Sequence, residues 1–580
     1  MEIKIDEDVR RLEMDSSNNP LAKNWVESRG AHIVLLGIIG GLAFFHNLSV
    51  SLFGDTEGLY AAITETMIRT GEYVHLTFYE KPFLNKPPLF FWFQALTSQA
   101  LGLNEVALRL PSAVFGLGTM FVTYWFGTIL FSRTAGFWAA LVVPTIYATV
   151  WFGQMGIIDP VLTFFMTLGL CGFARAYFQK DGQWWYVVAF VALAFGAMVK
   201  NLHAFAMPVV LFLGFLWIFR DNKPLKSLSF WSGLTVFMIL VGSYYAFLGQ
   251  EFWQHFFFQE NLRRMTMVGG DIKGSAFQAY VGSRPIHWYA YTIWFDFFPW
   301  SFLLPSSLIL LWNQRPFRQH PREAFILFWV IGYFLALSLF PEKHERYLLP
   351  LVPGMALWVG YLYHRRWSSG DLQGGAGTVI KIMLGVLSLA FLVVAFLGPF
   401  LLQKKWSVPA GVFPVMYQGI IVCVTGALLY FLYRSHLRKT LNMVGVLAVV
   451  FMVGIVVFIV PGIDAGASPR LLFTEIRSSL KHPTDLIYAY QHWNWRTDED
   501  LFYWQHLHRG ALILGWGTNP AEGLEILKHK VQSTGVLVIL MTEDQYQQSA
   551  SRDPDLNVTV LSEFRRPKVT ILLVSVELKH

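Results

Sequence analysis

Long apolar stretches alternate with short polar ones along most of the chain, up to about residue 461. A helix that crosses a bilayer needs about 20 mostly apolar residues, and most of these stretches approach or exceed that length. The pattern therefore predicts a polytopic membrane protein with 13 transmembrane helices. They are expected near residues 31–53, 106–130, 135–156, 160–178, 184–199, 203–219, 229–248, 288–312, 323–340, 347–363, 379–402, 413–433 and 441–461.

After residue 461 the pattern changes to short apolar runs separated by polar segments. The runs lie at residues 486–490, 511–516, 536–541, 558–561 and 569–576, and a polar helical stretch covers residues 521–532. This alternation is typical of a small α/β domain. We expect a polar segment at residues 1–30, a mainly α transmembrane domain at 31–461 and an α/β domain at 462–580.

Composition and charge agree with a membrane protein and suggest its orientation. Only 14% of the residues are charged, and the mean hydropathy is +0.44. The net charge is +7, and the basic residues are concentrated in the loops predicted to lie on the same side of the membrane as the N-terminus. The positive-inside rule therefore puts the N-terminus in the cytoplasm. Thirteen spans then put the C-terminal domain outside, and no nucleic-acid motif gives the positive charge another meaning.

The N-terminus does not predict a cleaved signal peptide, and the two cysteines do not predict a disulfide or metal-binding framework. The first 30 residues are polar, and no small-residue cleavage pattern follows the first apolar run, so this run is expected to remain as a helix. Cys171 and Cys423 both lie inside apolar runs, where they fit neither a disulfide framework nor a metal site. The histidines also lack ligand spacing, and we expect no metal and no cofactor.

The first outer loop, at about residues 54–105, predicts two helices on the membrane surface. Leu59, Ile63 and Met67 recur at helical spacing until Gly71, a natural helix end. A second helix is expected to begin at the Pro-Pro pair of residues 87–88 and to run to about Leu101.

Charged residues in this loop carry candidate chemistry. Lys86 precedes the second helix, whose N-terminus favours anions, so the pair could hold a lipid phosphate. A lysine that reaches up to the headgroups is an equally good alternative. Asp55, Glu57 and later Asp159, before Pro160, could activate an incoming hydroxyl. The alternative for these three carboxylates is ordinary helix capping.

These residues also resemble a known family. Six motifs carry the similarity. They are Asp55 with Tyr60, the Lys-Pro-Pro of residues 86–88, the Leu-Arg-Leu-Pro of residues 108–111, the Ile-Asp-Pro of residues 158–160, the Asn-Leu-Arg-Arg of residues 261–264 and the segment at 341–350. Together they resemble the aminoarabinose transferases and related bacterial glycosyltransferases. These enzymes are similar to protein O-mannosyltransferases and belong to the C-type (GT-C) membrane superfamily. The similarity covers nearly the whole chain.

The resemblance implies a donor, a site and a location. The donor would be a polyprenyl-phosphate sugar, and the acceptor an envelope glycolipid such as lipid A. The resemblance makes Asp55 and Asp159 catalytic carboxylates. It gives the lipid phosphate to Lys86, Arg264, Lys343 and Tyr347. A monomer in the bacterial inner membrane, with its active site facing the periplasm, is expected.

This sequence departs from the family pattern at two places. The family usually has an adjacent Asp-Glu pair after the position of Asp55, whereas here Thr56 fills the aspartate slot and Glu57 the glutamate slot. Either Asp55 replaces the usual acid, or Glu57 carries more of the work. The usual Thr-Lys-Gly-Pro motif reads Val-Lys-Asn-Leu at residues 199–202, which points to a different donor specificity.

Several basic residues are predicted on the outer side of the membrane, contrary to the positive-inside rule. We expect them to face one cavity that holds the phosphate. They are Lys86, Lys200, Arg263, Arg264, Lys343 and Arg346. Two other functions stay open. A protein O-glycosyltransferase would use a Ser or Thr acceptor. A transporter or flippase would be expected to show repeated halves and polar breaks at mid-membrane, which this chain lacks.

Overall fold

A computed structural model describes the protein over most of the membrane domain and part of the C-terminal region. The described residues are 28–51, 55–78, 81–179, 182–256, 284–305, 320–340, 343–369, 375–406, 414–467, 470, 474, 487–489, 528–529, 531–532, 536–548, 553–566 and 569–579.

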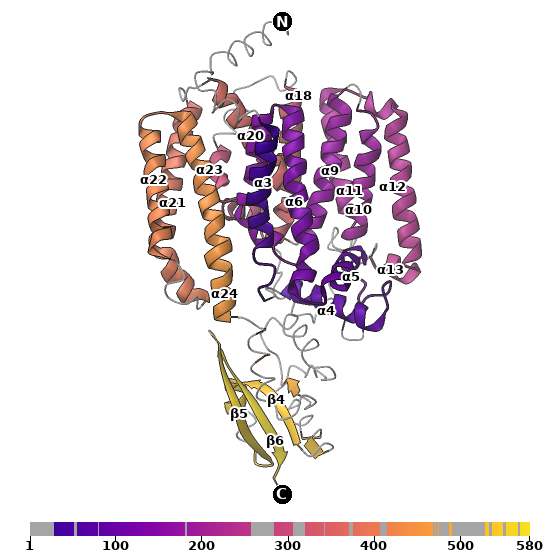
Figure 1. The fold of residues 1–580 in the computed structure, drawn as a ribbon. Coiled ribbons are helices and arrows are strands. Elements are labelled where there is room, and N and C mark those ends of the chain that lie inside the picture. The colour runs from indigo at the N-terminus through magenta and orange to yellow at the C-terminus, as the bar shows by residue number, and fades with distance from the viewer. Residues whose placement is uncertain are drawn as a thin grey trace.

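The described chain is mainly a bundle of long helices that run side by side (Figure 1). Seven helical segments in it are long and apolar enough to cross a membrane. They are α6 (Glu105–Leu130), α9 (Ile158–Phe178), α12 (Leu228–Phe247), the α18–α19 segment (Pro321–Leu339), α21 (Gly375–Trp406), α22 (Val415–Tyr433) and the segment from α23 (Leu437–Val453) to α24 (Val460–Ala467).

Other predicted spans are shorter or broken. The helices α3 (Arg29–Phe45), α10 (Trp185–Val199) and α11 (His203–Phe219) have 15 to 17 residues. The predicted span at 135–156 is a pair, α7 (Arg133–Val142) with α8 (Tyr147–Gly153), bent by 61°. The pair would be an eighth span. The predicted span at 288–312 is interrupted, because α16 (Trp288–Asp296) ends before the 3₁₀ turn η4 (Trp300–Leu303). The total of 13 spans and the membrane orientation stay predictions.

The bend between α7 and α8 has a local cause. Pro144 lies in a 3₁₀ turn, η1 (Val143–Thr145), and Ile146 is extended, so the helical hydrogen-bond ladder stops there. The N–H of Tyr147 instead donates to the carbonyl of Phe298. Trp300 supports the same turn, because its indole N–H donates to Oγ1 of Thr145 at 2.9 Å.

Small residues and aromatic rings hold the bundle together. A Cβ added to Gly127 in α6 would lie 2.8 Å from the Cα of Gly136 in α7, so glycine lets these two helices approach closely. Phe173 of α9 stacks on Phe212 of α11 with ring centroids 4.8 Å apart. Phe230 of α12 lies edge-on to Phe190 at 5.1 Å. Such pairs stabilise helix packing where lipid provides no hydrophobic driving force.

Two short helices cover one end of the bundle, where α24 also ends (Figure 1). The predicted extent of the first is confirmed: α4 (Asp55–Thr70) ends at Gly71, which has a φ of 71°. Its position on a membrane surface stays a prediction. The second, α5 (Leu89–Leu101), begins at Leu89 with Pro88 as its N-cap, rather than at the Pro-Pro pair itself. A two-stranded hairpin, β1 (Thr77–Phe78) with β2 (Lys81–Pro82), separates them. Both helices bury apolar faces against each other and against α9.

The C-terminal region contains a four-stranded sheet at the same end of the bundle as α4 and α5 (Figure 1). Its order is β3 (Ile487–Ala489), β4 (Val536–Thr542), β6 (Val569–Leu578) and β5 (Leu556–Arg566), and only β3 and β4 are parallel. α28 (Glu543–Gln548) follows β4. Four of the five predicted apolar runs overlap these strands, and the run at 511–516 lies outside the described residues. The domain boundaries and the side of the membrane stay predictions.

Candidate active site

Asp159 is clamped between two cations at the start of α9. Its side chain is almost fully buried, and Nζ of Lys200 lies 2.6 Å from Oδ1. Nε of Arg346 lies 3.5 Å from Oδ2. Two positive groups and one carboxylate leave this cluster with a net charge of +1. A buried cluster with surplus positive charge suits an anionic ligand.

Three separate elements bring this cluster together. Asp159 stands in the first turn of α9 and Lys200 at the C-cap of α10. Arg346 belongs to η7 (Glu345–Leu351), a 3₁₀ segment that packs on α9. Tyr347, the next residue, places its ring 4.4 Å from Nζ of Lys200 in a cation–π contact. The predicted catalytic Asp159 and the predicted phosphate ligand Tyr347 therefore share one lysine.

The start of α4 lies against the same cluster. Nη1 of Arg346 donates to Oγ1 of Thr56 at 3.1 Å, so Arg346 bridges α4 and Asp159. Asp55 is the first residue of α4. The start of α4 and Asp159, more than 100 residues apart in sequence, are thus connected through Arg346.

Glu57 points to a different partner. Its buried carboxylate receives two hydrogen bonds from Arg109, at 2.7 and 2.9 Å, and a third from the backbone N–H of Gly156 at 2.6 Å. Gly156 lies just before Asp159, so Glu57 fixes the turn that leads into α9. These contacts give Glu57 a positioning role.

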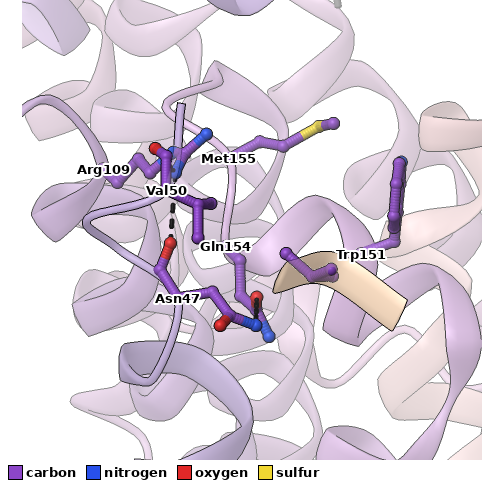
Figure 2. A pocket seen from close by; sticks show the side chains of 7 residues that line it. Asn47, Val50, Arg109, Trp151, Gln154 and Met155 are labelled. Carbon is purple, nitrogen blue, oxygen red and sulfur yellow. Dashed lines mark hydrogen bonds between the residues drawn. The ribbon is translucent and has the colours of Figure 1, made fainter. Parts of the chain in front are cut away.

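Arg109 binds Glu57 and also the backbone that follows α3. Its side chain is 1% exposed, and it donates to the carbonyls of Asn47, Leu48, Val50 and Ser51. Figure 2 shows Arg109 with Asn47 and Gln154 at a small pocket. There Nδ2 of Asn47 donates to Oε1 of Gln154 at 2.9 Å. The sequence motif includes Arg109 but did not predict that it holds Glu57 and the backbone at residues 47–51. An arginine inside an apolar helix is the feature that could have indicated this role.

Lys343 is buried beside η7. Its ammonium group donates to the carbonyls of Arg284 and Phe340. Burial lowers the pKa of this lysine below its usual value. The next residue is fixed too, because the hydroxyl of Tyr289 bonds both the backbone N–H and the carbonyl of His344.

Lys86 lies just before α5 and donates to the carbonyl of Asn85 at 2.9 Å. The N–H of Leu89, at the start of α5, donates to the hydroxyl of Tyr244 at 3.1 Å. That hydroxyl in turn donates to the carbonyl of Met198 at 3.4 Å, two residues before Lys200. The N-terminus of α5 is therefore anchored near the Asp159 cluster.

Two predicted basic residues and the expected absence of a metal stay untested. Arg263 and Arg264 lie outside the described residues. Within the described part of the chain, no three His, Cys, Asp or Glu side chains gather as a metal site. That the protein needs no metal stays a prediction.

Comparisons with known proteins match this architecture. Residues 47–258 match the family model described as dolichyl-phosphate-mannose-protein mannosyltransferase. The chain is 25% identical over 363 residues to the undecaprenyl phosphate-alpha-4-amino-4-deoxy-L-arabinose arabinosyl transferase of Yersinia pestis (strain Pestoides F). That match covers 60% of this chain and 62% of the relative, so it spans less than two thirds of the relative's length.

Solved structures show the same fold. The crystal structure of ArnT from Cupriavidus metallidurans bound to undecaprenyl phosphate aligns with a TM-score of 0.69 at 18% identity, covering 94% of this chain and 98% of that one. The apo structure of the same protein gives a TM-score of 0.70 at 18% identity, with 93% and 97% coverage. The resemblance to GT-C superfamily membrane glycosyltransferases of the aminoarabinose-transferase type is confirmed.

Proposed function

We propose that this GT-C-type membrane protein transfers a sugar from a polyprenyl phosphate, such as an undecaprenyl phosphate, to an acceptor hydroxyl. The observation that carries the proposal is the Asp159 cluster, in which Lys200 and Arg346 give a net positive site beside Tyr347 and the start of α4. The fold shared with ArnT and the match to a lipid-phosphate-dependent mannosyltransferase family support it.

In the proposed reaction, an acceptor oxygen attacks the anomeric carbon opposite the phosphate, which inverts that centre. The new C–O bond forms while the bond from carbon to the phosphate oxygen breaks, and its electron pair stays on the polyprenyl phosphate. The proton of the hydroxyl passes to Asp55, the proposed base. Lys200, Arg346 and Lys343 stabilise the negative charge that grows on the departing phosphate, together with Lys86, Arg264 and Tyr347. In this proposal Glu57 positions α4 through Arg109 and does not touch the substrates.

The acceptor and the location belong to the proposal too. We infer an envelope glycolipid such as lipid A as the acceptor, with the site facing the periplasm across the bacterial inner membrane. The relatives named as arabinosyl transferases support a bacterial envelope role. A protein acceptor is the second candidate, because residues 47–258 match a family named for protein mannosyl transfer.

A reconstituted transfer assay tests the proposal. Purified protein in liposomes is given an undecaprenyl-phosphate sugar with either lipid A or Ser/Thr peptides, and sugar-bearing product is measured. Product from lipid A, lost in Asp55→Asn and Asp159→Asn, is expected. Product from peptides alone would replace the glycolipid acceptor with protein. If no acceptor is glycosylated and no undecaprenyl phosphate binds, the proposal fails.

A further inference from the structure

The break between α10 and α11 carries polar groups that the proposed reaction does not use. Lys200 ends α10, and its ammonium is fixed on Asp159. Asn201 and Leu202 form the turn, and His203 is the first residue of α11. Asn201 and His203 therefore follow Lys200, the lysine of the Asp159 cluster, in the same turn.

Both side chains bury a polar atom that makes no bond. Oδ1 of Asn201 and Nε2 of His203 are inaccessible to solvent and have no hydrogen-bond partner within the described part of the chain. Buried polar groups in folded proteins are nearly always paired, with protein, ordered water or a ligand. Two unpaired atoms two residues apart, beside a catalytic cluster, point to groups that a bound molecule would supply.

Aromatic rings lie beside these polar side chains. The ring of His203 lies 5.7 Å from that of Tyr333, at an interplanar angle of 69°. Tyr333 is 1% exposed and belongs to α19 (Tyr333–Leu339). At the start of the turn, Nζ of Lys200 lies over the ring of Tyr347 at 4.4 Å. Aromatic rings next to a few polar side chains are typical of sites that bind small polar molecules.

We propose that Asn201 and His203 bind the sugar of the donor and decide which sugar is accepted. The amide of Asn201 can accept or donate a hydrogen bond, and Nε2 of His203 does one or the other according to its tautomer. Their ligands are hydroxyl or amino groups on the sugar ring, while the cationic cluster holds the phosphate. This inference rests on the proposed function, and it makes both residues specificity determinants rather than catalytic residues.

Binding measured without any acceptor separates the sugar from the phosphate. The probes are undecaprenyl phosphate, undecaprenyl phosphate-4-amino-4-deoxy-L-arabinose and a polyprenyl-phosphate mannose, each titrated against the purified full-length protein. The variants are Asn201→Ala, His203→Ala and His203→Gln, whose amide can replace one ring nitrogen as a hydrogen-bond partner. Asn442→Ala is the matched control, because its Oδ1 in α23 is also buried without a partner among the described residues.

The wild type is expected to bind one sugar-bearing lipid more tightly than the bare phosphate lipid. Each alanine variant at the turn should lose about tenfold in affinity for that lipid, the effect of one hydrogen bond, and keep its affinity for undecaprenyl phosphate. His203→Gln should keep part of the preference, and Asn442→Ala all of it.

Two results would overturn the inference in different ways. If the wild type binds undecaprenyl phosphate but neither turn variant changes the preference for a sugar, the buried atoms are structural, and the proposed function survives. The same holds if the variants weaken all three lipids equally. If the wild type binds none of the three lipids, the proposed function fails and the sugar site falls with it.

Discussion

Replacing Arg109 with alanine is expected to destabilise the fold by about 3–5 kcal/mol, the usual cost of removing one partner from a buried ion pair. The side chains of Arg109 and Glu57 are each 1% exposed, so water cannot replace the lost partner. The substitution removes both bonds to Glu57 and the bonds that Arg109 donates to four backbone carbonyls at residues 47–51. Most of the cost comes from the carboxylate of Glu57, which stays buried after it loses the guanidinium of Arg109.

The assay is unfolding of the purified protein in detergent micelles during an SDS titration, followed by tryptophan fluorescence. Glu72→Gln is the control, because Oε1 of Glu72 lies 3.5 Å from Nδ1 of His75 in the same loop, with side chains 48% and 72% exposed. Loss of such an exposed pair should cost about 0–1 kcal/mol. The double variant Glu57→Gln with Arg109→Ala should be more stable than Arg109→Ala alone, since it removes the buried charge.

A cost below about 1 kcal/mol for Arg109→Ala, equal to that of the exposed control, would refute the view that this pair holds the loop. A double variant as unstable as Arg109→Ala would show that the lost contacts to the backbone carbonyls, and not the lost ion pair with Glu57, dominate the cost. Transfer activity measured on variants that remain folded then reports whether α4 keeps its position beside Arg346.

Three further predictions follow from single side chains. Asp159→Asn should reduce transfer by about 100-fold, the scale of misplaced reacting groups, because Lys200 and Arg346 lose the carboxylate that holds them in place. The variant should still bind undecaprenyl phosphate at least as tightly, because the cluster charge rises from +1 to +2; weaker binding would contradict this electrostatic account. Burial lowers the pKa of Lys343, so phosphate binding should weaken as pH rises through that lowered value, and Lys343→Arg should remove the dependence, as titrations at increasing pH will measure. Burial also raises the pKa of Glu65 in α4 from 4.5 to about 7 against the opposing effect of Arg69, so the folded state holds this proton more firmly than the unfolded state. The stability that Glu65 contributes should therefore be full below about pH 4.5 and lost as pH rises through about 7, and Glu65→Gln, measured by the same SDS titration, should flatten that slope.

Local pattern was enough to predict the helical class and several elements. Apolar runs of spanning length became α6, α9, α12 and α21 to α24, because a bilayer leaves a helix as the simplest way to pair its backbone. Leu59, Ile63 and Met67, followed by Gly71, predicted α4 to within a residue at its end, because helical spacing and a left-handed glycine are local properties. The motifs also pointed to Asp159 and Tyr347, and two of the six basic residues expected to gather, Lys200 and Arg346, both contact Asp159.

Only the tertiary structure decided which charges meet. Asp159, Lys200 and Arg346 are separated by 41 and 146 positions, and their pairing depends on how α9, α10 and η7 pack. The sequence left Asp55 and Glu57 as rival acids; the packing of α6 against the first loop gives Glu57 to Arg109, because a buried carboxylate must find its counter-charge. The unpaired atoms of Asn201 and His203 likewise depend on the tertiary arrangement, which the order of apolar residues does not encode.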